Sequence, residues 1–246
     1  MGIHACDAIV LRQYPYRETS VLVSCLTDKF GKIKGLIKGL RGDERSRFRS
    51  SMESVSLNHI LFYDTRSSSL HLITQCELLR SYHELVHDVE DMRLASHFAE
   101  LADSILEVEE PAPLIFELLK DSIERVATCE PYFRSSVKAH FVLRLLRLAG
   151  FHPQLDECAV CAAHPYSSRA FWSLGQGGLL CEKCLHEDPN AEPISNEWLE
   201  ELSMIAQSDS PLELNSRYVK QTETRLDDFL RFRIEKTLKT MKMVTA

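Results

Sequence analysis

Residues 158–184 read CAVCAAHPYSSRAFWSLGQGGLLCEKC, and they contain the clearest structural signal in the chain. It contains two Cys-x-x-Cys pairs with nineteen residues between them. A Cys-x-x-Cys turn aims two thiolates at one point, and two such turns complete a tetrahedron of sulfur ligands around Zn²⁺. The spacing therefore predicts one structural zinc ion per chain, with four ligands: Cys158, Cys161, Cys181 and Cys184.

The residues between the two pairs are typical of a small hairpin. Residues 170–174 favour a strand, residues 175–178 a turn, and Leu179 and Leu180 return the chain to the second pair. A strand–turn–strand between two cysteine turns is the layout of a zinc ribbon. Two disulfides or a redox Cys-x-x-Cys are the weaker alternatives, since disulfides need an oxidising compartment and a redox pair is usually single. Four thiolates also fill the coordination shell, which disfavours a catalytic zinc.

The charge of the chain is divided unevenly. The net charge is −7, which by itself argues against a nucleic-acid binder. Residues 1–50 nevertheless carry ten Lys or Arg against five Asp or Glu, a balance of +5, so the remainder carries −12. This division predicts a local anion-binding face on an otherwise acidic protein. A second basic cluster ends the chain, at Arg231, Arg233, Lys236, Lys239 and Lys242.

The first eighty residues favour β structure. Five runs, at 8–11, 21–26, 33–37, 55–63 and 70–75, are rich in β-branched residues and separated by turn signals. Five short strands in that length predict a small closed barrel of the OB type. Gly35 and Gly39 predict a bulge or a tight bend near the third strand.

From about residue 78 the spacing of apolar residues changes to that of a helix. Apolar residues recur every three or four positions from Leu78 to Phe98 and on to Ile105, which predicts one long helix. Pro113 favours the start of a second helix, and Gly150 followed by Pro153 the end of a third. Ser195 is a good N-cap for a fourth, and a fifth carries Leu226, Leu230 and Ile234.

The predicted class is thus α+β and multidomain: an OB-type barrel followed by a helical domain into which a zinc-ribbon-like module with four cysteine ligands is inserted. The predicted domains are the barrel at 1–80, the first helical part at 81–150, the zinc module at 151–190 and the second helical part at 191–246. No apolar run is long enough for a membrane span, and no secretory signal is recognisable at the start. The sequence therefore predicts a cytoplasmic protein.

The basic stretch is the main candidate for a binding site. Lys32, Lys34 and Lys38 have even spacing, so they share one face of an extended strand. An OB barrel binds single strands across such a face, with cations on phosphates and aromatics such as Tyr14, Tyr16, Phe30 and Phe48 on bases. A solvated strand edge, kept charged to prevent edge pairing, explains the charges equally well. The predicted DNA contacts are Arg12, Lys32, Lys34, Lys38, Arg41, Arg45, Arg47 and Arg49.

No catalytic constellation is recognisable. The sequence contains no Walker A motif, no His-Glu-x-x-His and no Gly-x-Ser-x-Gly. A zinc deaminase needs Pro before the second Cys-x-x-Cys, and Leu180 stands there instead. We therefore expect that the protein is not an enzyme.

Two groups of motifs carry a resemblance to a known family. The first comprises Ala8-Ile9-Val10-Leu11-Arg12, Tyr14, Glu18-Thr19-Ser20, Leu26-Thr27, Gly31 and Lys38-Gly39-Leu40-Arg41. The second comprises Gly150-Phe151-x-Pro153, the paired cysteines, Phe171 and Gly177-Gly178. In this order, and over nearly the whole chain, they resemble the RecO family of bacterial recombination mediators.

The resemblance implies a function and a set of partners. Members of that family bind single- and double-stranded DNA, anneal complementary strands, and have no enzymatic turnover. They work with RecR and RecF to load RecA onto strands coated by single-strand-binding protein. The resemblance thus also implies a nucleoid-associated protein. By position, Arg12, Lys38 and Arg41 correspond to basic positions of the family signature, and the four cysteines to its zinc ligands.

Two other classes of function remain open from the residues alone. One is a zinc-ribbon module that binds proteins and not DNA, and the other is a metal-dependent nucleic-acid enzyme. Formation of product on labelled DNA distinguishes the enzyme from the rest. The interaction module is distinguished by a protein partner that is captured in a pull-down while the chain causes no mobility shift of DNA.

Overall fold

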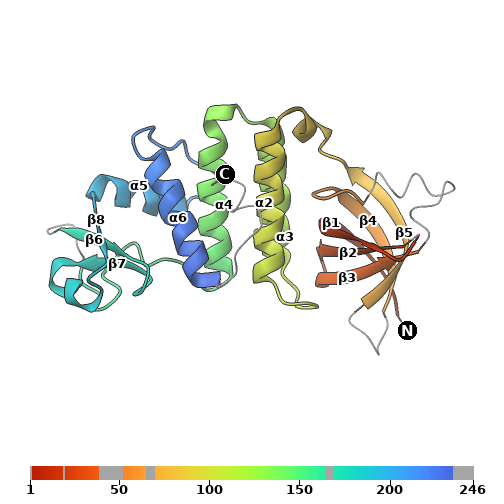
Figure 1. Cartoon of the computed structure of the whole chain (residues 1–246), viewed down its shortest axis with the longest axis horizontal. Coiled ribbons are helices and arrows are strands. Elements are labelled where there is room, and N and C mark those ends of the chain that lie inside the picture. Colours follow the sequence, from red (N-terminus) through yellow and green to blue (C-terminus); the bar gives the residue numbers. More distant parts are fainter. Residues whose placement is uncertain (1, 19, 39–51, 65–69, 165–168, 235–246) are drawn as a thin grey trace. The chain divides into compact units, whose positions relative to one another are not determined.

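The computed structural model describes residues 2–18, 20–38, 52–64, 70–164 and 169–234. The chain forms two compact units, one within Met1–Cys129 and the other within Glu130–Thr237 (Figure 1). Each unit combines strands with helices, as the predicted α+β class requires. The predicted domain boundaries near 80, 150 and 190 divide the chain by type of element and stay predictions.

The unit within Glu130–Thr237 contains the cysteine-rich stretch. A short 3₁₀ helix, η3 (Pro131–Phe133), leads into α4 (Arg134–Leu148), and α5 (Asn196–Gln207) and α6 (Val219–Ile234) both pack on α4. The segment between α4 and α5 holds a three-stranded antiparallel sheet in the order β7–β6–β8, made of β6 (Ala170–Ser173), β7 (Gly178–Cys181) and β8 (Glu192–Ile194). The 3₁₀ helix η4 (Glu182–Glu187) follows β7. The cysteine module is therefore inserted into a helical unit, as predicted, although β8 was not foreseen.

Local signals set the ends of these helices. Gly150 has φ of +77° after α4, and the Phe151 N–H donates to the Leu146 carbonyl at 2.8 Å, which ends the helix as the glycine predicts. The Ser195 hydroxyl accepts from the Trp198 N–H at 3.3 Å and caps α5.

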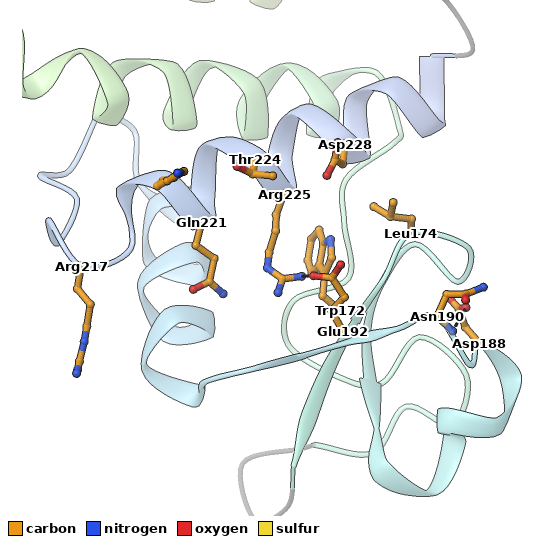
Figure 2. Close-up of a pocket in the computed structure, with 11 residues that line it drawn as sticks. Trp172, Leu174, Asp188, Asn190, Glu192, Arg217, Gln221, Thr224, Arg225 and Asp228 are labelled. Carbon is orange, nitrogen blue, oxygen red and sulfur yellow. Dashed lines mark hydrogen bonds and ion pairs between the residues drawn. The ribbon is translucent and has the colours of Figure 1, made fainter. Parts of the chain in front are cut away.

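Aromatic side chains join the sheet of this unit to its helices. The ring of Trp172 on β6 packs edge-on against Trp198 of α5, with centroids 5.6 Å apart, and lies 5.6 Å from Phe229 of α6. The indole N–H of Trp198 donates to the Thr222 hydroxyl at 2.9 Å. Figure 2 shows α6 passing over the sheet with Trp172 beneath it.

The unit within Met1–Cys129 begins with a closed barrel in the strand order β1–β2–β3–β5–β4. The strands are β1 (Ile3–Tyr16), β2 (Ser20–Thr27), β3 (Gly31–Ile37), β4 (Leu57–Tyr63) and β5 (Leu70–Arg80). All neighbours are antiparallel except β3 and β5, which pair in parallel from Lys34–Leu70 to Leu36–Leu72 and close the barrel. The predicted five-stranded OB-type barrel is confirmed.

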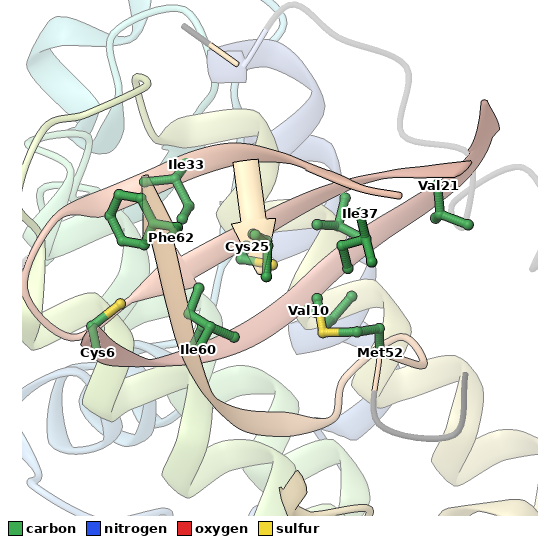
Figure 3. Packing of buried hydrophobic residues seen from close by; sticks show 12 residues of the cluster. Cys6, Val10, Val21, Cys25, Ile33, Ile37, Met52, Ile60 and Phe62 are labelled. Atoms are coloured by element: carbon green, nitrogen blue, oxygen red, sulfur yellow. The ribbon is translucent and has the colours of Figure 1, made fainter. Parts of the chain in front are cut away.

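Alternate residues of the barrel strands fill its interior. Val10, Cys25, Ile33 and Ile60 are completely buried there, and Phe62 packs beside them (Figure 3). Burying each such side chain contributes about 1.5–3 kcal/mol. Gly35 is also on the inner face, where an added Cβ would overlap the Ile73 side chain. The glycine on β3 therefore serves close packing across the barrel, where the sequence predicted a bulge or bend.

The predicted helix from Leu78 to Phe98 is wrong at its start. Leu78 lies on β5 and pairs with Asn58, Leu85 lies in a 3₁₀ turn, η2 (His83–His87), and α2 (Val89–Ile105) begins only after Asp88. The Asp88 side chain caps α2 by accepting from the Glu90 N–H at 2.8 Å. Apolar residues on the last strand thus continued the helical spacing by coincidence.

Helices α2 and α3 (Pro113–Thr128) pack on each other, α2 also packs against β1, and α3 touches β2. Asp103 of α2 is the centre of the α2–barrel contact. Its carboxylate lies 2.8 Å from Arg12 Nε and 3.7 Å from Lys32 Nζ, and accepts from the Ser24 hydroxyl at 2.8 Å. The Asp103 carbonyl accepts from Lys32 Nζ at 2.6 Å, and Glu100 lies 3.3 Å from Arg12 Nη2. One residue of α2 therefore ties together β1, β2 and β3.

Replacing Asp103 with Asn should loosen this packing. The change removes the charge that compensates two partly buried cations, and we expect a loss of about 2 kcal/mol in local stability. Hydrogen exchange of the β1 and β2 amides, read by mass spectrometry, should become about thirtyfold faster. Glu107→Gln, at an exposed position shortly after α2, serves as the control. Equal exchange in both variants would show that the charge network does not hold α2 on the barrel.

Candidate functional site

The first candidate site is the cysteine cluster, which two turns of the chain build. In the first turn the Ala162 N–H donates to the Cys158 carbonyl at 2.8 Å, and the Cys158 N–H donates to the Ala163 carbonyl at 2.9 Å. The Ala159 N–H donates to the Leu179 carbonyl at 2.8 Å and fastens this turn to β7. The second turn places Cys181 at the end of β7 and Cys184 in η4. The hairpin predicted between the pairs is present as β6 and β7.

The four thiols converge as a zinc site requires. All four sulfur atoms lie within 4.8 Å of one another, and Cys161 Sγ is 3.7 Å from Cys181 Sγ. The cysteines are free thiols, so the alternative of two disulfides does not describe this structure. Zinc–sulfur bonds of about 2.3 Å in a tetrahedron put sulfur atoms about 3.8 Å apart. The donor set and its spacing therefore fit Zn²⁺.

The electrostatics of the cluster also favour a cation. Burial opposes ionisation of Cys158, but N–H groups of Cys181, Cys161 and Val160 outweigh it and lower its pKa to about 6. Burial, and then the neighbouring thiols, raise the pKa of Cys184 to about 12. The first thiol of the cluster therefore ionises readily, whereas the last thiol ionises with difficulty, because negative charge has already accumulated beside it. A bound dication offsets that repulsion and allows all four thiolates to form.

The structure separates the predicted cationic DNA contacts into three groups. Arg12 and Lys32 lie on the outer face of the barrel and are held by Asp103 beneath α2, and Lys32 is only 8% exposed. Lys34 and Lys38 are exposed on and just after β3. Arg41, Arg45, Arg47 and Arg49 lie outside the described residues. As predicted, Lys32 and Lys34 share a face of the strand, but α2 covers one end of that face.

The outer face of β1, β2 and β3 carries three rows of side chains, which we call the barrel face. Its first row adjoins α2, because Arg12 and Ser24 in that row contact Asp103. The strand pairing aligns Arg12, Ser24 and Lys34 in the first row and Tyr14, Leu22 and Leu36 in the second. Tyr16 and Ser20 form the third row, next to the end of β3 where Lys38 follows. Tyr14 is 45% exposed. The barrel face therefore combines aromatic and apolar side chains with lysines beside them.

This alignment depends on an irregularity that the sequence did not reveal. The pairing of β1 with β2 shifts between Val10 and Arg12, so Leu11 is an extra residue. The bulge turns Arg12, Tyr14 and Tyr16 outward, whereas Val10, Cys6 and Ala8 before it face the core. Burial opposes ionisation of Arg12, but a Tyr14 hydrogen bond and the Asp103 and Glu100 carboxylates raise its pKa.

Phe30 and Phe48 are the two other aromatic residues predicted to contact bases. Phe30 packs against the barrel core, with its ring 5.4 Å from Phe62 and 4.9 Å from His4, so it does not contribute to the barrel face. Phe48 lies outside the described residues.

The C-terminal basic cluster is described only in part. Arg231 is exposed, whereas the Arg233 guanidinium packs over Phe229 and Phe232. Lys236, Lys239 and Lys242 are outside the described residues.

If the four cysteines hold a structural zinc ion, replacing any one of them should remove the metal and loosen the module. Metal analysis of the purified chain should give one zinc per molecule, and Cys161→Ser or Cys181→Ser should lose it. Because apparent zinc affinity is folding free energy, on the order of 10 kcal/mol, amides of β6 and β7 should then exchange rapidly. Cys129→Ser, which removes a thiol outside the cluster, should keep its zinc. Stoichiometric zinc in a Cys161→Ser/Cys181→Ser double variant would contradict the assignment.

Within the described residues, no helix has both the length and the apolar character needed to cross a lipid bilayer.

Comparison with known proteins places the chain among its relatives. The family model for the N-terminal part of recombination protein O matches residues 1–82, and the model for its C-terminal part matches residues 86–242. The DNA repair protein RecO of Moorella thermoacetica is 31% identical over 184 residues, which cover 74% of this chain and 67% of that protein. RecO of Syntrophus aciditrophicus is 30% identical over 199 residues, which cover 78% and 74% of the two chains. The resemblance noted in the sequence is thereby confirmed, and the chain belongs to the RecO family of DNA repair proteins.

Proposed function

We propose that this protein is a DNA-binding recombination and repair mediator that acts by binding alone. It binds single- and double-stranded DNA, anneals complementary strands and helps to load the recombinase onto strands coated with single-strand-binding protein. Membership of the RecO family supports the role in DNA repair and recombination. The barrel face is the single observation that carries the DNA-binding part of the proposal.

The barrel face has the two kinds of group that single-strand binding uses. Bases of a single strand can stack on Tyr14 and Tyr16, and such stacking is tolerant of sequence because every base has a π-face. Lys34 and Lys38 lie beside those rows, where the phosphates of a strand stacked on the tyrosines would pass. OB barrels bind oligonucleotides across this same strand 2–3 surface. Arg12 and Lys32 contribute indirectly, because they hold α2 beside the barrel face.

The annealing activity follows from charge. Two complementary strands repel each other through their phosphates, and cations that neutralise phosphates on both strands lower that repulsion. The net charge of −7 confines DNA to local basic surfaces, so we propose that the barrel face holds one strand. The C-terminal basic cluster, to which the exposed Arg231 belongs, is the proposed second surface. Neither surface needs nucleotide hydrolysis or a catalytic residue.

The proposed protein partners come from the family resemblance. They are RecR, the single-strand-binding protein and, indirectly, the recombinase RecA. The zinc has no step in this mechanism. When bound, it fixes the fold of the module between α4 and α5.

Substitutions on the barrel face should separate phosphate contacts from base stacking. Each lysine that contacts a phosphate contributes about 0.7 to the slope of log affinity against log salt for single strands. Replacing both Lys34 and Lys38 with Ala should therefore flatten the slope by about 1.4 and weaken binding of all sequences alike. Tyr14→Ala should leave the slope unchanged and cost about 1–3 kcal/mol, or about fivefold to 150-fold in affinity. Fluorescence anisotropy of a labelled oligonucleotide over a salt series measures both effects.

The matched control is Lys29→Ala, which removes an exposed lysine from the turn between β2 and β3 of the same barrel. Unchanged affinity and slope in the Lys34→Ala/Lys38→Ala variant would refute binding at this face. Annealing of complementary oligonucleotides, with and without the coating protein, tests the mediator role. No DNA binding at low salt, together with retained binding of the coating protein, would favour the zinc-ribbon interaction module. Annealing that required ATP would refute the non-enzymatic mechanism.

A further inference from the structure

A pocket of about 510 Å³ lies between the cysteine module and α6, within one compact unit of the chain. We call it the α6 pocket. Figure 2 shows its position: α6 forms one wall, and β6 and the segment that leads into β8 form the other. Its volume is in the range of ordinary ligand pockets. None of its lining residues belongs to the cysteine cluster or to the barrel face, so the lining has no role in the function proposed above.

The α6 pocket has charges of opposite sign at its two ends. Arg217 and Lys220 are exposed at the end where α6 begins, and neither side chain makes an ion pair with a described residue. Asp228 lies two turns further along α6, half-buried and without a hydrogen-bond or ion-pair partner among the described residues. Asp188 and Asn190 stand near that end on the opposite wall (Figure 2). Asp188 accepts from the Ser173 hydroxyl and the Asn190 N–H, whereas Arg217, Lys220 and Asp228 have no partner of opposite charge in the described part of the chain.

Between the two ends the lining is more enclosed. Arg225 of α6 pairs with Glu192 of β8 at 3.0 Å, and its side chain is only 13% exposed. Trp172 forms part of the lining and is 3% exposed, and its indole Nε1–H has no acceptor in the described part of the chain. A buried donor without an acceptor is uncommon in folded proteins. A ligand that occupies the pocket contacts Trp172, and a carbonyl or carboxylate oxygen on it is the type of acceptor that this indole lacks.

The distance between the charged ends indicates the size of the ligand. Lys220 and Asp228 are eight residues apart on one helix, which corresponds to about 12 Å along its axis. An extended peptide advances about 3.3–3.6 Å per residue, so four residues span about 13–14 Å. Side chains four positions apart on an extended chain also point to the same side. The peptide carbonyls between them supply acceptors of the kind that Trp172 lacks.

We propose that the α6 pocket binds an extended segment of a partner protein that carries an acidic and a basic side chain four residues apart. The acidic side chain pairs with Arg217 and Lys220, and the basic side chain pairs with Asp228 and approaches Asp188. Charge complementarity selects this occupant. A purely acidic segment or a nucleic-acid strand would place negative charge against Asp228 and Asp188, and a purely basic segment would meet Arg217 and Lys220.

The test uses the full-length zinc-loaded protein and the probe peptide acetyl-Glu-Ala-Ser-Ala-Arg-amide. The chain has two tryptophans, so a ¹H–¹⁵N correlation spectrum contains two indole signals, which Trp172→Phe assigns. Addition of the peptide should shift the Trp172 indole signal saturably, and more than that of Trp198, whose N–H is already bonded to Thr222. Peptides with Gln in place of Glu, or Gln in place of Arg, should bind about fivefold more weakly, as expected for loss of one ion pair.

Variants of the protein complete the test. Asp228→Asn and Lys220→Ala should each weaken binding of the probe peptide about fivefold. The matched controls, Glu200→Gln on α5 and Arg169→Ala before β6, change exposed charges that do not line the pocket and should stay within twofold. Failure of millimolar peptide to shift the Trp172 signal would overturn the proposal. Equal binding of the Gln-substituted peptides, or equal losses in the control variants, would also overturn it.

Discussion

The carboxylate of Asp103 is the contact on which the barrel-containing unit depends. It accepts from Ser24 and pairs with Arg12 and Lys32, so a single residue of α2 contacts three strands. Two cations on a barrel surface would repel each other without it, and their partial burial would be costly. The same contact determines which part of the outer face is covered and which part stays open for a ligand. The barrel face is therefore defined as much by α2 as by the strands that carry it.

The cysteine module depends on a comparable constraint. Four thiols within 4.8 Å cannot all ionise without a cation, and β7 supplies the backbone contact that fastens the first of the two turns. A metal ion bound by these thiolates would add to the small apolar core that so short a segment can form. The sheet of the module provides Trp172 for packing against α5 and α6, which couples the cysteine module to the helices of its own unit.

Features set by local chemistry could be predicted from the sequence. The cysteine spacing gave the cluster and its hairpin, Gly150 and Ser195 gave helix ends, and turn residues gave the five strands of the barrel. Features set by distant partners could not. Nothing near Arg12 or Lys32 in the sequence indicates that Asp103, more than seventy residues away, neutralises them. The bulge at Leu11 determines which side chains of β1 face outward. Leu78 fits the apolar spacing of a helix, but it lies on β5 and pairs with Asn58 of β4. Long-range pairing overrides local periodicity at each of these positions.

The two tryptophans are distributed unevenly over the molecule, and this determines what its intrinsic fluorescence reports. Trp172 and Trp198 lie in the same compact unit, whereas tyrosine and phenylalanine are the only fluorescent side chains of the barrel. Tryptophan emission therefore reports directly on the cysteine module and its helices, and the barrel sequence carries no tryptophan of its own. Events at Trp172 and Trp198 can thus be followed separately from stacking of a nucleotide on Tyr14, which would change tyrosine emission. Tryptophan and tyrosine emission thus give separate optical signals for the two compact units.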